Sequence, residues 1–488
     1  MNFISPIEDQ YIYYNAPYES KYSENIEILY GNKRESDDLF NRQNELPHIY
    51  SITNKYRIDM TIYETYSIDP PGCDDADDAF SIFIENDKMF LAIHIADPTE
   101  LINIESPLWS DMISRIVTKY PSNRKPIHLM PEFIVHQSSL IENTCGNIKN
   151  AITILTEIDQ TTYMPIGNIK QIFSIIKVST SNAMSYTEAV DKSMDVFALV
   201  NGLRISKSLF ESRSTKTFGT KLNEISPSMV VFKNKNIPIL TKVCTIEHDM
   251  KQMIAEFAIF ANSFIGEFLK INLNGTGIFR TCAANAWLDT VSNDIVGVDL
   301  LHEIITQGIR ADYMSSCESH DLVGMPEYCH FTSPIRRISD CICHYLLKYI
   351  YLNNQNCLIH IPFNETELEL LSEKCVVTSR NIKKIQYKDT KFRMIQAMNH
   401  YLKFNKPVIK LTFFMTSYSG LFLNIIICKI NEHNVQLSYT LRVKNYKGII
   451  GKHTHHTIDI YQVNCLGLYD QGSIPELDEY ITKVNITE

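Results

Sequence analysis

The spacing of apolar residues divides the chain into three stretches. Residues 1–55 are polar and rich in tyrosine with few periodic apolar segments, so we expect a short or irregular N-terminal element. From residue 56 to about 403, segments typical of strands and of helices are mixed. Strands are predicted at 64–68, 79–84 and 89–96, where short apolar runs flank a polar loop.

Three longer segments have the spacing of helices. Apolar residues recur every three or four positions over 247–270, which gives the clearest helix. A second helix is predicted from Pro334 to about Tyr351, with Pro334 in its first turn and Thr332 or Ser333 as its cap. A third is predicted over 365–402, where Asn364 and Glu367 are placed to form a capping box.

After residue 404 the pattern changes to short strands separated by turn residues. Strands are predicted at 408–414, 421–430, 435–443 and 457–463. Several short strands in so small a segment indicate a separate β domain over 404–488, built as a small barrel or sheet.

Composition is that of an ordinary globular protein of 488 residues, 44% of them hydrophobic. No apolar run is long enough to span a bilayer, and the first residues do not resemble a secretory signal. Twelve irregularly spaced cysteines without a Cys-x-x-Cys pair predict a reduced, intracellular setting, and we expect the cytoplasm and no membrane contact. The net charge of −10 does not indicate nucleic-acid binding, although a local basic channel remains compatible with it.

The loop between the first two predicted strands holds five aspartates, Asp69, Asp74, Asp75, Asp77 and Asp78. Carboxylates so close together repel one another and raise one another's pKa. Because apolar strands flank the loop, a site for a hard cation, magnesium or manganese, explains the cluster better than a solvated acidic turn. The ligand spacing of an EF-hand calcium loop is absent.

The segment 330–340 combines two arginines with the predicted start of the second helix. We expect Arg336 and Arg337 in the first turn of that helix, beside its unpaired backbone N–H groups. Such an arrangement suits a phosphate group, while a plain surface ion pair explains two arginines equally well.

Taken together, the two segments resemble the RNB catalytic domain of ribonuclease II, ribonuclease R and the hydrolytic exosome subunit. The resemblance rests on Ile-Asp-Pro-Pro-Gly-x-x-Asp-x-Asp-Asp-Ala at 68–79 and His-Phe-Thr-Ser-Pro-Ile-Arg-Arg at 330–337. Weaker matches lie at 93–97, 120–131, 185–189 and 255–262, so it covers roughly residues 60–395. It implies an α+β fold over 56–403, a mixed sheet surrounded by helices, with an OB-like domain at the C-terminal end.

The resemblance also implies an activity and a set of site residues. The activity is processive hydrolysis of single-stranded RNA from a free 3′ end, with Mg²⁺, to nucleoside 5′-monophosphates. Asp69, Asp75, Asp77 and Asp78 fall on the four catalytic, metal-holding aspartates, whereas Asp74 is an extra carboxylate. Arg336 falls on the arginine that steadies the scissile phosphate. Substrate-binding positions fall on Tyr120 at the terminal base, Glu256 at the terminal ribose, Tyr186 and Arg337.

The chain departs from the family pattern in a few places. Ile338 replaces a tyrosine, and Ala255 replaces the first of two glutamates. Residues 1–55 are much shorter than the family's two cold-shock domains, so they form at most a reduced cold-shock region. A protein partner could supply the missing contacts to RNA.

Two weaker candidates and two rival functions complete the picture. His453, His455 and His456 form a candidate zinc site that lacks a fourth ligand. A basic stretch from Arg380 to Arg393 is either a solvated helix face or a wall of an RNA channel. The rival functions are a catalytically silent RNA-binding or scaffold subunit and a DNA exonuclease. The silent subunit differs from an exoribonuclease in lacking turnover, and the DNA exonuclease differs in its sensitivity to the 2′-hydroxyl of the substrate.

Overall fold

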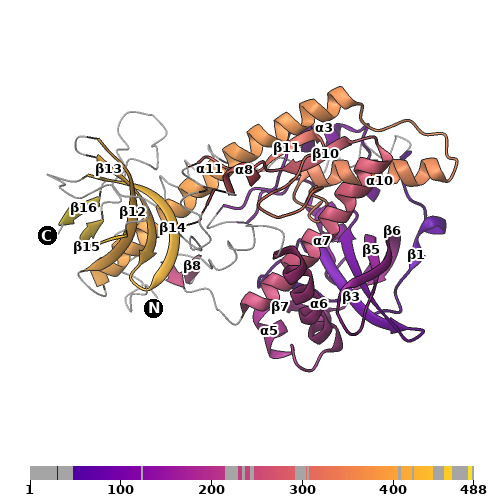
Figure 1. The fold of residues 1–488 in the computed structure, drawn as a ribbon, viewed down its shortest axis with the longest axis horizontal. Coiled ribbons are helices and arrows are strands. Elements are labelled where there is room, and N and C mark those ends of the chain that lie inside the picture. The colour runs from indigo at the N-terminus through magenta and orange to yellow at the C-terminus, as the bar shows by residue number, and fades with distance from the viewer. Residues whose placement is uncertain are drawn as a thin grey trace.

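A computed structural model describes residues 30, 48–121, 125–214, 229–233, 237–241, 247–288, 290–291, 300, 304, 307–404, 408–419, 422–442, 455–463 and 482–485. A sheet surrounded by helices forms the larger part, and the long helix α11 (Glu365–Phe404) extends from it to a small β-barrel (Figure 1). The predicted mixed α and β architecture with a small C-terminal β domain is therefore confirmed.

The main sheet has five strands in the order β1-β6-β5-β4-β3. β1 runs parallel to β6, and the other neighbours are antiparallel. The strand β4 lies inside the sheet and is buried on both faces, which explains its continuous apolar run. The strands are β1 (Ile58–Asp59), β3 (Asp78–Glu85), β4 (Lys88–Ala96), β5 (Ile148–Ile158) and β6 (Pro165–Lys177).

Helices pack on this sheet and on one another around one large apolar core. α6 (Phe197–Ser214) contacts β3 and lies beside α7 (His248–Asn272), which confirms the predicted helix over 247–270. α10 (Ile338–Asn354) is buried along most of its length. The shorter helices are α3 (Pro107–Arg115), α4 (Glu132–Ser138), α5 (Tyr186–Asp191) and α8 (Asn285–Leu288), with 3₁₀ turns at Asn54–Tyr56, Pro98–Glu100 and Thr180–Asn182.

Small strand pairs complete this part of the chain. β2 (Ser67–Asp69) pairs in parallel with β7 (Ala183–Ser185), so the strand predicted at 64–68 is shorter and lies slightly later. β10 (Thr276–Thr281) pairs antiparallel with β11 (Asp312–Ser316). β8 (Met229–Lys233) and β9 (Ile237–Thr241) form a hairpin.

The acidic loop connects β2 to β3 and is fixed by backbone contacts. Gly72 has φ +81°, a conformation that other residues rarely adopt, and it allows the chain to turn there. Further along, the N–H of Ala76 donates to Ser139 Oγ at 3.0 Å, and the N–H of Ala96 donates to the carbonyl of Asp77 at 2.8 Å. Asp77 is therefore held against the core, Asp69, Asp75 and Asp78 are partly buried, and Asp74 is exposed.

The second predicted helix begins four residues later than expected. Pro334 and Arg336 lie in a turn, Arg337 is extended, and α10 starts at Ile338. The cause is a tertiary contact: Thr118 N–H donates to the carbonyl of Arg336 at 2.9 Å, and Ile338 N–H donates to that of Ile116 at 2.9 Å. The expectation that both arginines occupy a first helical turn is thus wrong.

The third helix has the predicted cap. Asn364 N–H donates to Glu367 Oε2 at 2.8 Å, and Glu367 N–H donates to Asn364 Oδ1 at 2.9 Å. This reciprocal pair is a capping box, and it fixes the start of α11.

The C-terminal strands close into a barrel in the order β12-β13-β14-β16-β15. β14 and β16 are parallel, and the other neighbouring strands are antiparallel. A closed five-stranded barrel is the architecture of OB-folds. The four predicted strands are present as β12 (Ile409–Ser419), β13 (Phe422–Ile430), β14 (His433–Arg442) and β15 (His456–Val463), joined by β16 (Thr482–Asn485).

The candidate zinc site lies only partly in the described structure. His453 falls outside the described residues, while the rings of His455 and His456 pack on Phe414 and Phe413. A zinc ion there stays a prediction. Among the described residues, none of the helices has the length and apolar character needed to cross a membrane.

Candidate active site

A cavity of about 580 Å³ lies where the acidic loop, α7 and the turn before α10 meet. It brings together eight of the nine residues to which the sequence assigned a role. Those lining it are Asp69, Asp75, Asp77, Asp78, Tyr120, Tyr186, Arg336 and Arg337. The extra carboxylate, Asp74, is not part of the lining, and neither is Glu256.

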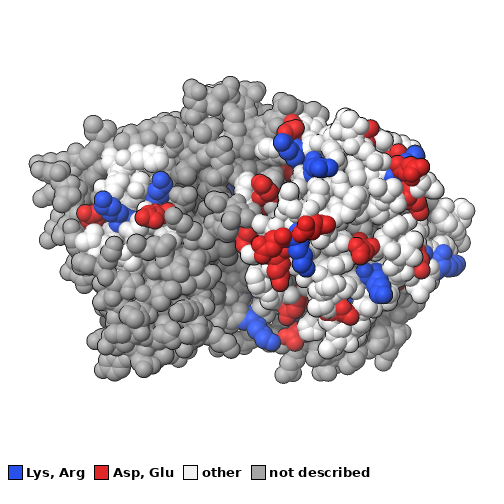
Figure 2. Space-filling view, turned by 90° about the horizontal axis from the view of Figure 1, so that it is seen from below, with Lys and Arg blue, Asp and Glu red and all other residues white. Residues whose placement is uncertain are grey.

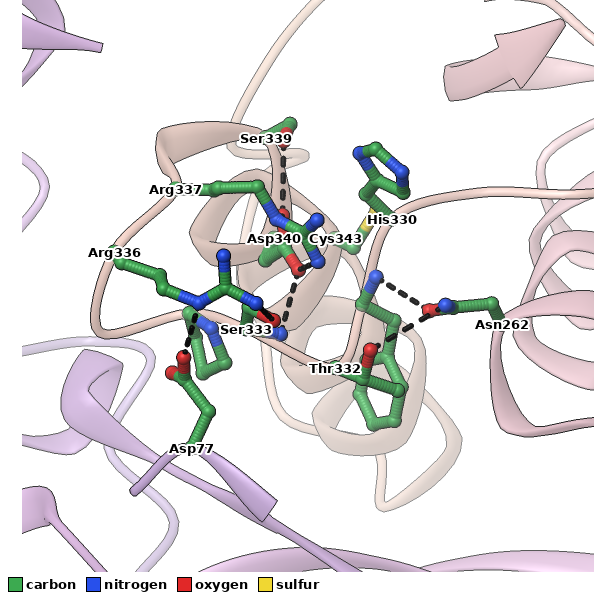
Figure 3. Close-up of polar contacts among 12 residues, drawn as sticks. Asp77, Asn262, His330, Thr332, Ser333, Arg336, Arg337, Ser339, Asp340 and Cys343 are labelled. Carbon is green, nitrogen blue, oxygen red and sulfur yellow. Dashed lines mark hydrogen bonds and ion pairs between the residues drawn. The ribbon is translucent and has the colours of Figure 1, made fainter. Parts of the chain in front are cut away.

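Asp77 joins the acidic loop to the turn before α10. Its Oδ1 accepts the N–H of Ile335 at 2.8 Å, and its Oδ2 accepts from Arg336 Nε at 3.0 Å (Figure 3). Burial nevertheless raises the pKa of Asp77 to about 7, although Arg336 and the Ile335 N–H act in the opposite direction. The pair places a guanidinium and a carboxylate side by side at the cavity wall.

Arg336 keeps donor capacity beyond this ion pair. Its Nη2 donates to Ser333 Oγ at 2.8 Å, which orients the guanidinium (Figure 3). Its Nη1 has no protein partner among the described residues, and the side chain is 43% exposed. Arg336 can therefore contact an anion in the cavity while it stays bonded to Asp77.

Arg337 has a different role because its charge is already neutralised. Its guanidinium makes two bonds to Asp340, at 2.8 and 3.0 Å, and Asp340 Oδ1 also accepts the N–H of Ser333 at 2.7 Å. The Arg337–Asp340 pair thus holds the turn that presents Arg336 (Figure 3).

Tyr120 lies on the cavity wall. Its hydroxyl donates to Asp75 Oδ2 at 3.0 Å, and the side chain remains 39% exposed. Asp75 Oδ1 in turn accepts from the Cys73 thiol at 3.4 Å. An aromatic face is therefore held beside the carboxylates with its ring accessible from the cavity.

Asp69 ends β2, and Asp78 begins β3. Burial and the neighbouring Asp77 and Asp75 raise the pKa of Asp69 to about 6. Burial and Asp69 raise the pKa of Asp78 to about 7. Asp69 Oδ2 is a buried oxygen without a hydrogen-bond partner, which is costly unless something else binds it.

These carboxylates suit a hard divalent cation. Within the described residues, no three acidic, histidine or cysteine side chains are already drawn together as a metal cage. Asp75 and Asp77 are instead bonded to Tyr120 and Arg336. The unpartnered oxygen of Asp69 and the mutual repulsion of the cluster nonetheless fit a cation bound by carboxylate oxygens.

Glu256 does not line the cavity, so the geometry does not support its predicted place at the terminal ribose, which stays a prediction. It is 1% exposed and forms a buried ion pair with Arg213 of α6, with Nε 3.2 Å from Oε2. The preceding residue, Ala255, lines the cavity instead. A helix presents only residues three or four apart on one face, and Glu256 lies on the face toward α6.

Two cavity residues on α7 were given no role from the sequence, although Asn262 ends one of the weaker family matches, at 255–262. Lys251 pairs with Glu247 at 2.7 Å, and its Nζ is 5.2 Å from the ring centroid of Tyr186. Asn262 binds the motif segment directly: its Oδ1 accepts the N–H of Phe331 at 2.8 Å. The helical period of α7 predicted a buried face but not which face would line a site.

The comparisons with known proteins agree with this geometry. A family model for the RNB domain matches residues 57–353. The chain is 26% identical over 346 residues to exosome complex exonuclease RRP44 homolog A of Arabidopsis thaliana. The aligned region covers 61% of this chain and 36% of that protein. The chain thus spans about a third of that relative's length.

Solved structures show the same fold at low identity. The Mycoplasma genitalium RNase R in complex with ribose methylated single-stranded RNA is 15% identical, with a TM-score of 0.70 over 93% of this chain and 76% of that one. Yeast Ssd1, described as a pseudonuclease, gives a TM-score of 0.59 at 16% identity over 84% of this chain and 56% of that one. The family match spans more than half of the sequence, and this chain belongs to the RNB domain family.

Proposed function

We propose that the chain is a 3′-to-5′ exoribonuclease that hydrolyses single-stranded RNA processively to nucleoside 5′-monophosphates. The observation that carries the proposal is the convergence of four aspartates and a partly exposed arginine on one cavity. Relatives in the RNB family include proteins named exonuclease and ribonuclease, which is consistent with that reaction.

The carboxylates would hold Mg²⁺ through Asp69, Asp75, Asp77 and Asp78. When bound, the cation supplies positive charge that stabilises the attacking and leaving oxygens of an in-line displacement. For that to happen, Asp69, Asp77 and Asp78 must be ionised, although burial favours their protonated forms. Asp77 would also keep Arg336 aligned along the cavity wall.

Arg336 and Tyr120 would position the RNA. The free Nη1 of Arg336 can donate to a non-bridging oxygen of the scissile phosphate and answer the charge that develops there. The exposed ring of Tyr120 can stack on a terminal base, an interaction that accepts any base.

A catalytically silent RNA-binding subunit is the second candidate, since the pseudonuclease Ssd1 shares the fold. The complete set of aspartates favours turnover, because a buried cluster of repelling carboxylates is costly to keep without a cation to bind.

The test is product analysis with purified full-length chain. A 5′-labelled single-stranded RNA incubated with Mg²⁺ should shorten from its 3′ end, and nucleoside 5′-monophosphates should accumulate. A circular RNA of the same sequence, which has no 3′ end, should stay intact. Binding without any shortening would support the silent subunit, and equal cleavage of the circle would refute exonuclease action.

A further inference from the structure

A group of basic side chains lies behind the Arg337 end of the cavity, on β10, β11 and α11. Among the described residues there, five cations accompany two carboxylates, so the region has an excess of positive charge. The cations are Arg280, Arg310, Arg337, Arg380 and Lys383, and the carboxylates are Asp312 and Asp340.

The two carboxylates are already bound to three of these cations. Asp312 accepts from Arg380 at 2.6 Å through both oxygens and lies 3.8 Å from Arg310, while Asp340 is paired with Arg337. Arg280 and Lys383 have no ion-pair partner among the described residues. Both are therefore available to an anion from outside.

Arg280 is held in place by an aromatic ring. Its guanidinium carbon lies 4.7 Å from the ring centroid of Tyr313, its cross-strand neighbour on β11. The Tyr313 hydroxyl is 2.7 Å from Nδ1 of His330, a residue that lines the cavity. Arg280 is thus positioned directly behind the cavity wall, with its donors free for an oxygen ligand.

Lys383 lies on α11 three residues after Arg380, whose bonds to Asp312 hold this helix against β11. It reaches solvent, yet its pKa is lowered by partial burial and by the charges of Arg280 and Arg337. Like charges brought together this way repel, and the repulsion is relieved when an anion binds between them.

We infer that Arg280 and Lys383 together bind a backbone phosphate of the RNA other than the scissile one. The inference rests on the proposed function. A phosphate fits because it carries negative charge and several acceptor oxygens, which match a guanidinium on β10 and an ammonium on the adjoining helix α11. A carboxylate from the protein is the usual partner, and the nearby ones are already occupied.

On one face of the molecule (Figure 2), other surface charge offers little competition for this role. On the face drawn in Figure 2, the described basic side chains are interspersed with acidic ones and form no extended basic area. In a chain of net charge −10, a local pair of uncompensated cations therefore contributes more to the attraction of an anion than it would in a basic protein.

The test uses fluorescence anisotropy in EDTA with 5′-labelled oligouridylates, from dinucleotides to about twelve nucleotides long. Arg280→Gln, Lys383→Gln and the double variant are compared with the parental chain. For long RNAs, the affinity of each variant should fall about fivefold at 0.1 M salt. The slope of the logarithm of the binding constant against the logarithm of salt concentration should flatten by about 0.7, the value for one phosphate contact on a single strand. Because both side chains hold one phosphate, the double variant should lose little more than either single one.

The dependence of binding on RNA length distinguishes a failure of this inference from a failure of the proposed function. The shortest RNAs should bind the variants as they bind the parental chain, because they fill the cavity without reaching Arg280 and Lys383. The control is Lys374→Gln, an exposed lysine on the same helix outside the group, which should leave binding unchanged. Unchanged affinity for long RNAs in the double variant, or an equal loss at every length, would overturn the inference, whereas parental chain that neither binds nor shortens RNA would refute the proposed function itself.

Discussion

Tyr120 has two interactions that single substitutions can separate. Its hydroxyl is bonded to Asp75, and its ring is open to the cavity. Tyr120→Ala should remove stacking worth about 1–3 kcal/mol, so the shortest RNAs escape earlier and the limit product lengthens by a nucleotide or more. Tyr120→Phe keeps the ring and should keep the parental limit product. Sequencing gels resolve the two, and the same limit product in both variants would place Tyr120 outside the base-binding site.

At the level of residues, the sequence predicted which side chains gather but not how they pair. Adjacent aspartates between two apolar strands indicate a cation site because their charges must be compensated. The bond between Asp77 and Arg336 joins residues 259 positions apart, so no local pattern contains it. The ion pair of Glu256 was hidden for the same reason, since its partner Arg213 lies on another helix.

At the level of elements, the buried Glu256–Arg213 ion pair links α6 to α7. Glu256→Ala leaves the Arg213 guanidinium buried without its carboxylate and should lower the free energy of unfolding by about 3–5 kcal/mol. The variant molecules that remain folded should discriminate between RNA and DNA as the parental chain does, because Glu256 is outside the cavity. Urea unfolding and a comparison of the two substrates measure these effects.

A matched control for this prediction removes both charges. Arg213→Met combined with Glu256→Met should recover most of the lost stability, because apolar side chains of similar volume replace a buried pair at little cost. If Glu256→Ala instead relaxes discrimination against DNA while stability is unchanged, the side chain reaches the substrate and the buried pair is not its main interaction.

Periodicity predicted most helices and strands because their apolar faces pack on the core. The helix predicted over 247–270 and the C-terminal strands lie within a few residues of α7 and β12–β15. The predicted start of α10 was wrong because pairing with residues 116–118 keeps Arg336 and Arg337 out of the helix. A contact so distant in sequence cannot be inferred from local helix signals.

At the scale of the whole molecule, the acidic loop should couple stability to pH and to magnesium. The ordinary pKa of aspartate is 3.8, and in the folded, metal-free chain it rises to about 6 for Asp69 and about 7 for Asp77 and Asp78. Between about pH 4 and pH 7 the folded state therefore binds more protons than the unfolded state. Its free energy of unfolding should decrease as pH rises through that window.

Magnesium should counteract this loss, because it binds the ionised carboxylates and competes with protons. We expect Mg²⁺ to raise Tm clearly at about pH 8 and hardly at about pH 5, where all three groups are mostly protonated in the folded chain. Thermal unfolding followed by fluorescence at both pH values measures the effect. An equal shift at the two pH values would mean that Mg²⁺ binds elsewhere.

The overall architecture was largely predictable, since both the mixed catalytic domain and the small β domain follow from residue patterns and the family resemblance. The closure of the barrel was not, because the parallel pairing of β14 with β16 joins strands separated by a long segment. The basic group around Arg280 and Lys383 was equally hidden, since β10 and α11 are about a hundred residues apart.

The most direct test of the central claim is the effect of Asp77→Asn on Mg²⁺-dependent shortening of a 5′-labelled single-stranded RNA under single-turnover conditions. Asparagine keeps the acceptor for Ile335 N–H but removes the negative charge beside Arg336 and the cation. The rate should fall by at least about a thousandfold, equivalent to several kcal/mol of transition-state stabilisation, while RNA binding is retained. Asp74→Asn, outside the cavity lining, should keep most activity. Degradation by Asp77→Asn at near the parental rate would contradict the assignment of the aspartates as the catalytic metal site.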